Sequence, residues 1–381
     1  MHNSWTYLDT PTPERLAEAI TKLRASDGRL RGVFALVCDT EADRPAVAWL
    51  QQQATAAGVP VVGTIVPGLV VQDGFRRAGV LLLGFEPDSP TTIVSLPHVD
   101  GRTDTDASDT LIEFIANHSN PNGGDTLLLA LDVRVPDAAT LLDRVYLEIG
   151  DQVNYAGLCS GSETFQPIPC VFDNERFVGD AALAVILRHH PGASLAHHYR
   201  GHEALWVATA TRGGHIQTID GKPAFEVYQA LMTSEYGIAL DRTNFYNYGV
   251  HFPFALNRAQ GEPLLRLPVS VEEDGTVYCS GEIRENALLS VVRAVEPGWV
   301  GAAVEVGEGV RQHPSNGVLL FYCAGRFLHL GEEHAAVEVT ALRDTVAPAP
   351  VFGALCLGEI GALKHQYPAF HNATITALPW T

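Results

Sequence analysis

Three stretches of this chain share one pattern, in which an apolar strand runs into a glycine and a second glycine follows within a few residues. They are Val61-Val62-Gly63-Thr64-Ile65-Val66-Pro67-Gly68, Tyr155-Ala156-Gly157-Leu158-Cys159-Ser160-Gly161 and Val351-Phe352-Gly353-Ala354-Leu355-Cys356-Leu357-Gly358. Glycine where a buried strand ends permits a sharp turn or a close approach of the backbone to a ligand. For each stretch alone the two interpretations stay open, but the recurrence favours a site that the stretches share.

Each stretch ends a longer unit made of a strand, a helix and a second strand. The units comprise strand 33–37, helix 45–58 and strand 59–62; strand 127–131, helix 136–150 and strand 153–156; and strand 318–323, helix 332–342 and strand 351–352. A proline opens the first two helices and a glycine ends them. The pattern predicts an α/β protein with mixed sheets covered by helices, built from repeated strand-helix-strand units in two packed halves.

The charge balance excludes several classes of partner. Among 381 residues there are 44 acidic and 25 basic side chains, which gives a formal charge of −19. Such a surface repels nucleic acid and anionic membranes. The longest apolar run, residues 59–71, is interrupted by prolines and is too short to span a bilayer, so we expect no membrane insertion. The N-terminus lacks the features of an export signal, which predicts a cytoplasmic protein.

The second half of the chain resembles the FIST sensory family. The resemblance is carried by Asn316-Gly317-Val318-Leu319-Leu320-Phe321-Tyr322-Cys323-Ala324-Gly325-Arg326, by Gly358-Glu359-Ile360-Gly361 and by His371-Asn372-Ala373-Thr374. Thr209, Gly213-Gly214 and Asp220-Gly221-Lys222-Pro223 resemble the junction of the family's two halves. The resemblance implies a FIST N-like domain at 1–220, a FIST C-like domain at 221–381, and an intracellular module that binds a small ligand and signals to a partner protein.

The middle of the chain is similar to a stand-alone branch of that family, whose members bind haem and sense nitric oxide. Cys159-Ser160-Gly161-Ser162 and Pro169-Cys170-Val171-Phe172 are similar to its middle segment, and His197-His198-Tyr199 falls where a His-Gly-Trp triplet is expected. The glycine and the tryptophan of that triplet are replaced here. The resemblance implies haem b held by His197 or His198 beside Tyr199, and a histidine kinase as the partner.

The histidines themselves leave this open. Haem iron needs an axial ligand in an apolar pocket, and neutral imidazole is the usual one. His189 and His190 precede Pro191-Gly192, so we expect them to be solvated at a turn. His197 and His198 are expected to alternate across a strand, so that one of them faces inward. For the inward residue, iron ligation and a hydrogen-bonded core histidine remain alternatives.

The remaining site prediction rests on the glycine-containing turns. We expect the ligand to contact residues from the second and third of them: Gly157, Cys159, Ser160, Gly161, Gly358 and Glu359. Glu359 could instead accept hydrogen bonds from neighbouring amides. Without haem, the same module would bind a small metabolite such as an amino acid.

A catalytic alternative rests on Cys159. The segment Gly157-Leu158-Cys159-Ser160-Gly161 has cysteine where a nucleophile elbow would have serine, and prolines follow where the elbow needs a helix. A hydrolase-like enzyme with a Cys159 nucleophile and a histidine base is therefore a third hypothesis, and we expect a non-enzymatic protein. The six cysteines are scattered, and most are expected to be reduced.

Two further segments carry predictions. Residues 98–110 are rich in Asp, Thr and Gly and are predicted to be a surface loop. The aromatic run 245–254 is predicted to be mostly core. If part of it is exposed, it would suit a homodimer or kinase contact, since aromatic residues concentrate at interface centres.

Overall fold

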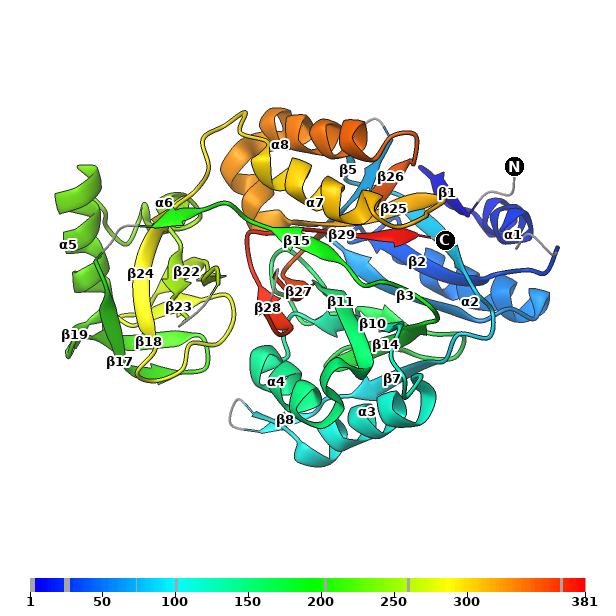
Figure 1. Ribbon diagram of the computed structural model, residues 1–381, viewed down its shortest axis with the longest axis horizontal. Helices are drawn as coiled ribbons and strands as arrows, with labels where there is room; N and C mark the ends of the chain where they lie inside the picture. The colour runs from blue at the N-terminus through cyan, green and yellow to red at the C-terminus, as the bar shows by residue number, and fades with distance from the viewer. Residues whose placement is uncertain are drawn as a thin grey trace.

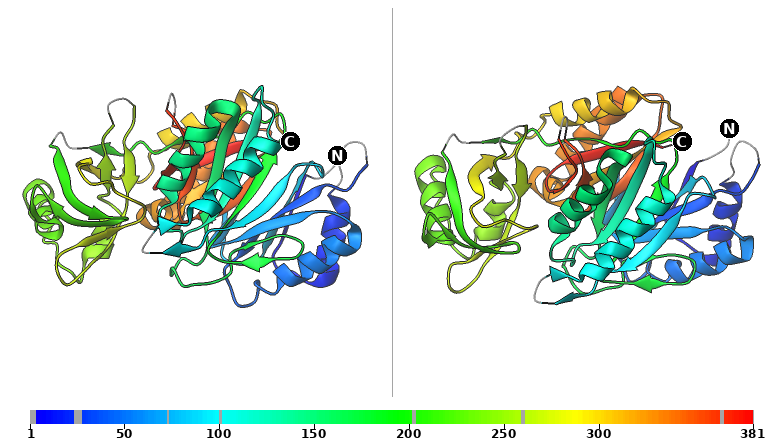
Figure 2. Two further views of the ribbon diagram at one scale, coloured as in Figure 1. Left: turned by 90° about the horizontal axis from the view of Figure 1, so that it is seen from below. Right: turned by 60° about the horizontal axis from the view of Figure 1, so that its bottom comes forward.

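The computed structural model describes residues 4–23, 28–72, 74–99, 102–201, 204–258, 261–363 and 366–380. Figure 1 shows a main body of sheets and helices, with a smaller β-rich domain in green and yellow to its left. Both views of Figure 2 also place the smaller domain beside the body, not over one of its faces. In the described residues, no helix is both long and apolar enough to cross a membrane.

The body is built from three units with the same order of elements. The first is β1 (Trp5–Leu8), α1 (Pro13–Lys22), β2 (Gly32–Cys38), α2 (Ala46–Ala57), β3 (Val61–Val66) and β6 (Val80–Phe85). The second is β7 (Thr91–Ser95), α3 (Thr105–His118), β10 (Asp125–Asp132), α4 (Ala138–Ile149), β11 (Val153–Ser160) and β14 (Ala181–Leu187). The third is β15 (Ser194–Ala196), α7 (Gly301–Arg311), β25 (Gly317–Cys323), α8 (Ala324–Val346), β26 (Val351–Cys356) and β29 (Ile375–Trp380).

Each unit forms one mixed sheet with the same strand order. The orders are β1-β6-β2-β3, β7-β14-β10-β11 and β15-β29-β25-β26. In each sheet the last two strands are parallel, because a helix connects them. The second strand pairs antiparallel with the third, and the first strand pairs antiparallel with the second. The two helices of each unit pack against each other. The mixed sheets and the repeated strand-helix-strand units predicted from the sequence are confirmed.

A hairpin from another unit extends each sheet. β4 (Gly68–Val71) and β5 (Gly74–Arg76) of the first unit join β26 of the third. β27 (Glu359–Gly361) and β28 (Ala369–His371) of the third join β11 of the second, and β12 (Val171–Phe172) and β13 (Phe177–Val178) of the second join β3 of the first. The exchange is cyclic, and β3, β11 and β26 contact one another where the three sheets meet.

The sequence pattern predicted that the repeated glycines end their strands, and this prediction is wrong. Gly63, Gly157 and Gly353 lie inside β3, β11 and β26, each at the same register against the neighbouring parallel strand. A Cβ atom at Gly157 or Gly353 would collide with the carbonyl oxygen of Leu129 or Leu320. These glycines therefore permit close approach of two backbones to each other, not of a backbone to a ligand.

The smaller domain, residues 200–293, is inserted between β15 and α7 of the third unit. Its strands are β16 (Arg200–Gly201), β17 (Trp206–Arg212), β18 (His215–Ile219), β19 (Lys222–Pro223), β20 (Phe254–Leu256), β21 (Leu264–Arg266), β22 (Pro268–Val271), β23 (Val277–Cys279) and β24 (Leu288–Arg293). Helices α5 (Ala224–Tyr236) and α6 (Phe245–Gly249) pack on this sheet through a separate apolar core. The boundary placed at residues 220 and 221 lies in the turn between β18 and β19.

Capping residues mark the first turns of α1 and α3, and the second of these helix starts lies in a stretch predicted to be a loop. The Thr12 hydroxyl accepts a hydrogen bond from the Arg15 amide and Pro13 opens α1, as their types predict. The predicted loop at 98–110 is wrong, because α3 begins at Thr105. Asp104 caps that helix by accepting from the Asp106 amide, so its polar residues mark a helix start. The same stretch also contains β8 (His98–Val99) and β9 (Arg102–Thr103).

The close approach of the parallel strands predicts that Gly157→Ala is strongly destabilising. We expect the free energy of unfolding to fall by about 3 kcal/mol or more, because the Leu129 carbonyl must move within a packed sheet. Urea unfolding followed by circular dichroism measures the change. Gly58→Ala is the control: Gly58 has a positive φ of 68° but open space around it, so the loss should be about 1 kcal/mol. Equal losses in the two variants would contradict the prediction.

Candidate functional site

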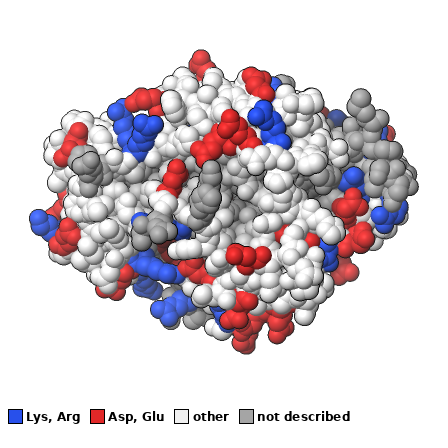
Figure 3. Space-filling model, viewed as in Figure 1, with Lys and Arg blue, Asp and Glu red and all other residues white. Residues whose placement is uncertain are grey.

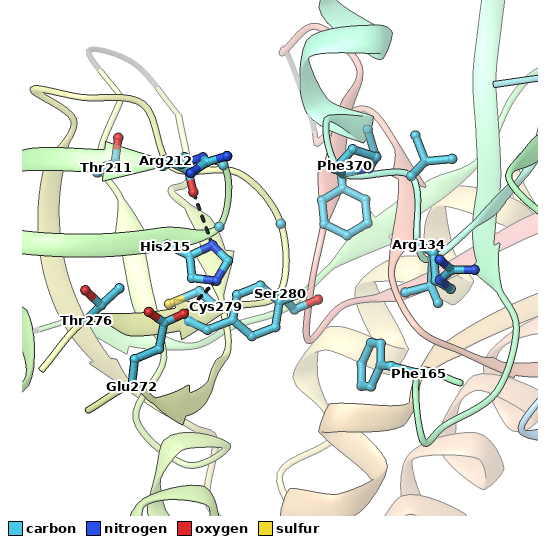
Figure 4. A pocket seen from close by; sticks show the side chains of 18 of the residues that line it. Arg134, Phe165, Thr211, Arg212, His215, Glu272, Thr276, Cys279, Ser280 and Phe370 are labelled. Atoms are coloured by element: carbon cyan, nitrogen blue, oxygen red, sulfur yellow. Dashed lines mark hydrogen bonds and ion pairs between the residues drawn. The ribbon is translucent and has the colours of Figure 1, made fainter. Parts of the chain in front are cut away.

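A cavity of about 800 Å³ lies between the small domain and the body. Figure 4 shows residues of the small domain on one side and Arg134, Phe165 and Phe370 of the body on the other. The small-domain wall is formed by the β17–β18 hairpin, by the turn between β22 and β23, and by β23 with the two residues that follow it. The body wall is formed by the segment after β10, by Cys159 near the end of β11, and by β28.

Three arginines line this cavity in a chain dominated by acidic residues. Arg102 comes from β9, Arg134 from the segment after β10 and Arg212 from the end of β17. Arg134 lies 3.7 Å from the Asp180 carboxylate. In the described part of the chain, no carboxylate forms an ion pair with Arg102 or Arg212. In Figure 3 acidic side chains are scattered over a face that is mostly uncharged, and basic ones form small groups, one of them at the lower left.

The two carboxylates that line the cavity already have partners. Glu272 Oε1 lies 3.1 Å from His215 Nε2, while His215 Nδ1 lies 3.2 Å from the carbonyl oxygen of Arg212. The His215 ring also packs on Tyr278, with 4.7 Å between ring centroids. Asp274 accepts a hydrogen bond from the Thr276 amide. The cavity lining thus holds three arginines and two carboxylates, and neither carboxylate forms an ion pair with a lining arginine in the described residues.

A second, apolar groove of about 80 Å³ adjoins the cavity. It lies between α6, β22 and the first turns of α8, and its apolar lining includes Val250, Leu267, Val269, Phe327, Leu328 and Leu357. Phe165 and Ser280 line both the cavity and the groove, so the two spaces are neighbours with part of their lining in common. Phe165 has φ of 57° and is 39 % exposed. A positive φ is unfavourable for a bulky residue, and such strain is often found at binding sites.

Asn372 lines the groove beside Ser280, which lines both the groove and the cavity. Its side chain is buried, with Nδ2 donating to Ser280 Oγ at 3.3 Å. Asn372 Oδ1 has no hydrogen-bond partner among the described residues. A buried acceptor without a partner costs free energy, so this atom is suited to a donor on a ligand.

The two walls are connected by Phe370 and Arg266. The Phe370 ring packs against Gly281 of the small domain and Gly358 of the body, and a Cβ at either glycine would collide with it. Arg266, which is buried, donates to the carbonyl oxygens of Phe370 and Glu282 at 3.2 and 2.8 Å. These contacts make the placement of the small domain depend on the β27–β28 hairpin.

Among the residues predicted from the glycine-containing turns, Cys159 lines the cavity. Its amide donates to the Gly358 carbonyl at 2.8 Å, within the β11 edge. Ser160 is buried and donates to the Leu131 carbonyl, and the Gly161 amide donates to the Ile65 carbonyl. Gly157 packs on Leu129, as described above. The structure therefore brings Cys159 to the cavity and places Gly157, Ser160 and Gly161 in the sheet contacts behind it.

The environment of Cys159 does not favour a nucleophile. Burial raises the pKa of its thiol, and the nearby Glu359 and Asp132 carboxylates raise it further. A nucleophilic cysteine needs the opposite, a thiol whose pKa is lowered by a cation or a helix N-terminus. No hydrogen bond links it to a histidine in the described residues. The structure thus gives the hydrolase hypothesis no support.

Glu359 is fully buried in the β27 edge. Its Oε2 accepts from the amide and the hydroxyl of Thr374, at 3.1 and 2.6 Å, and its Oε1 accepts from the Cys356 thiol at 3.1 Å. Burial raises the pKa of this carboxyl to about 7. The residue does what the alternative prediction stated, since it accepts hydrogen bonds from its neighbours, and it does not line the cavity or the groove.

His197 and His198 do not lie in a strand, because β15 ends at Ala196 and His198 has φ of 58°. His197 is buried; its Nδ1 accepts from the Tyr199 amide at 3.0 Å. Its Nε2 lies 3.2 Å from both the Pro263 carbonyl and the Glu262 carboxylate. Burial lowers the pKa of His197 to about 4, so the ring is neutral near pH 7 and Nε2–H donates. Of the two alternatives for the inward-facing histidine, iron ligation and a hydrogen-bonded core residue, His197 has the contacts of the second.

The described residues do not fit a haem held by this triplet. A ligating imidazole needs one nitrogen with a free lone pair, and both nitrogens of His197 are engaged. His198 Nε2 lies 2.6 Å from Glu305 Oε2, and its Nδ1 accepts from the Trp299 indole at 3.5 Å. Tyr199 is buried against Arg326. None of the three lines the cavity or the groove.

His190 differs from its expected solvated state. It is buried, and its ring nitrogens are hydrogen-bonded to the Thr126 hydroxyl and the Pro379 carbonyl, at 2.8 and 2.7 Å. His190 thereby connects the second unit to the last strand of the third. The prediction that His190 is solvated at a turn is wrong, because the turn-forming residues Pro191 and Gly192 say nothing about the burial of the residue before them.

Two family models match the chain. The FIST N domain model matches residues 33–222, and the FIST C domain model matches residues 224–362. The chain belongs to the FIST family. No curated protein matches it. Both FIST domains contribute to the cavity, since Arg134 and Arg212 lie in the first match and Glu272 and Ser280 in the second.

The FIST cavity also contains residues that sequence reasoning missed. Arg102, Arg134, Arg212, Phe370 and Asn372 were not predicted to act, and no spacing in the sequence connects them. One signal was available: Gly213-Gly214 was identified at the junction of the two halves, and it forms the β17–β18 turn on the cavity wall. Arg212 directly precedes this glycine pair, so the junction also carried a signal for one charged residue of the cavity.

The buried, neutral state of His197 predicts a loss of stability in acid. The folded pKa of about 4 lies below the unfolded value near 6.5, so the unfolded chain binds more protons as the pH falls between them. His197 should cost the FIST protein roughly 2 kcal/mol of stability at pH 5 relative to pH 8. His190, at about 4, acts in the same direction, whereas Glu359, at about 7, favours the folded state as the pH falls below 7.

The measurement is urea unfolding from pH 8 to pH 5 of the wild type and of His197→Asn, whose Oδ1 can replace Nδ1 as an acceptor. The variant should lose less stability toward pH 5, by roughly 2 kcal/mol. His118→Asn at an exposed position is the control and should follow the wild type. Parallel curves for wild type and His197→Asn would show that His197 is not the titrating group.

Proposed function

We propose that this FIST protein is a sensor that binds an organic anion, without haem, in the cavity between the small domain and the body. The observation that carries the proposal is the cavity's positive lining in a chain with a formal charge of −19. Arg102 and Arg212 have no ion-pair partner among the described residues, whereas of the two cavity carboxylates Glu272 lies against His215 and Asp274 accepts a hydrogen bond from a backbone amide. Guanidinium groups are well suited to carboxylates and phosphates, because they present several donors in one plane.

The size and walls of the cavity support a small organic ligand. A volume of about 800 Å³ falls in the range of small-molecule sites, and Phe165, Tyr278 and Phe370 supply aromatic surface beside the charged groups. An inorganic ion would leave most of that surface without a contact. An amino acid or another metabolite with a negative group would use both kinds of contact.

The domain arrangement offers a route from binding to signalling. The small domain joins the body through two segments, residues 197–199 and 294–300, and through the contacts of Phe370 and Arg266. A ligand that contacts both walls favours the domain arrangement in which both walls are close enough to contact it. It shifts the equilibrium between two arrangements by the difference between its affinities for them. A partner such as a histidine kinase would recognise the altered surface.

Haem-based sensing of nitric oxide is the competing proposal, supported by the resemblance of the middle segment to the haem-binding branch. The hydrogen bonds of His197 and His198 favour the haem-free form. The absorption spectrum of protein expressed with ample haem separates the two. A Soret band that shifts with nitric oxide and is lost in His197→Ala or His198→Ala would overturn the haem-free proposal.

The arginine lining predicts which substitutions weaken binding. In a panel of small organic acids tested by thermal shift and titration calorimetry, the tightest binder should lose roughly ten- to hundredfold affinity in Arg134→Ala and in Arg212→Ala. Arg311→Ala, at an exposed position outside the cavity, is the control and should bind normally. If no organic acid binds the wild type, or if all three variants bind equally, the proposed function fails.

A further inference from the structure

The apolar groove extends the cavity in one direction. Its walls are the side chains of α6, β22 and α8, and its rim carries three large apolar residues that are substantially exposed: Phe165, Tyr246 and Leu328, at 39, 54 and 53 %. The Arg77 guanidinium at this rim is paired with Glu163 and stacks over Phe327, so its charge is already balanced. The groove therefore offers apolar contact with no unpaired charge, next to a cavity that offers positive charge.

The junction between the two spaces adds a hydrogen-bond requirement. Ser280 lines both spaces, and its hydroxyl oxygen accepts a hydrogen bond from the side-chain amide of Asn372. Asn372 Oδ1 is buried without a partner among the described residues, at a residue that lines the groove. A ligand that passes from cavity to groove would bring its middle portion to this acceptor. An N–H at that point would satisfy it.

We propose that the ligand of this FIST protein is an amphiphilic anion of the N-acyl amino acid class. Its carboxylate contacts the cavity arginines, its amide N–H donates to Asn372 Oδ1, and its acyl chain lies in the apolar groove. This inference rests on the proposed function for the carboxylate and goes beyond it for the amide and the chain. Water leaves the groove when the chain enters, which favours binding in proportion to the apolar area buried.

The first test is a ligand series that lengthens only the chain. Titration calorimetry compares N-acetyl-, N-butanoyl- and N-hexanoylglycine on the full chain. Affinity should rise by up to about fourfold for each added methylene until the groove is filled. Equal affinities along the series would overturn the groove assignment while leaving the proposed function intact. If no member binds, and no other organic acid does, the proposed function fails together with this inference.

The second test places a charge in the groove. Leu328→Lys should lose the gain in affinity with chain length, because an ammonium group then lies beside the acyl chain. Val337→Lys is the matched control, since Val337 lies in the part of α8 beyond the break at Gly331, is similarly exposed at 42 % and does not line the groove. A gain with chain length that survives in Leu328→Lys would overturn the proposal.

The third test isolates the hydrogen bond at Asn372. The wild type should bind N-hexanoylglycine roughly two- to tenfold more tightly than its ester analogue, in which oxygen replaces the N–H. In Asn372→Leu the amide and the ester should bind equally, with thermal melting as the check on folding. An amide preference that is missing in the wild type, or unchanged in Asn372→Leu, would overturn the role of Asn372.

Discussion

The exchange of hairpins between the three units is the constraint on which the rest of the structure depends. Each pair of parallel strands has an outer edge whose amides and carbonyls need partners, and a strand from another unit provides them. No unit can complete its own sheet in this arrangement. The units are therefore joined by main-chain hydrogen bonds as well as by apolar packing, and β3, β11 and β26 must approach closely where the sheets meet.

The candidate site is a consequence of that exchange. The β27–β28 hairpin crosses from the third unit to the second, and it carries Phe370 to the cavity and leads directly to Asn372 at the groove. Cys159 reaches the cavity from the strand that this hairpin completes. The third unit also contains the inserted small domain, which supplies the opposite wall. Sheet completion and site formation thus use the same segment of backbone.

The sequence allowed the repeated units to be predicted, because buried strands, helix boundaries and glycines are local features. The function of those glycines could not be predicted in the same way, since a glycine required by a neighbouring strand and one required by a ligand look alike in sequence. Gly157 was placed in the ligand site for that reason, and it faces the Leu129 carbonyl instead. The hairpin exchange was likewise beyond reach, because strand partners distant in sequence leave no spacing pattern.

The positions of charged residues in the fold were also not predictable from the sequence. The net charge of −19 predicts that nucleic acid is not a partner, but a sum over the chain conceals where the basic exceptions lie. Arg102, Arg134 and Arg212 are far apart in sequence and come together because a hairpin, a strand end and a sheet edge meet at one cavity. In a strongly acidic protein, exposed guanidinium groups without an ion-pair partner, such as Arg102 and Arg212, gain little from distant carboxylates, because solvent and salt screen them. A bound anion would be their nearest source of favourable charge, and it would have to touch both domains to reach Arg134 and Arg212 together.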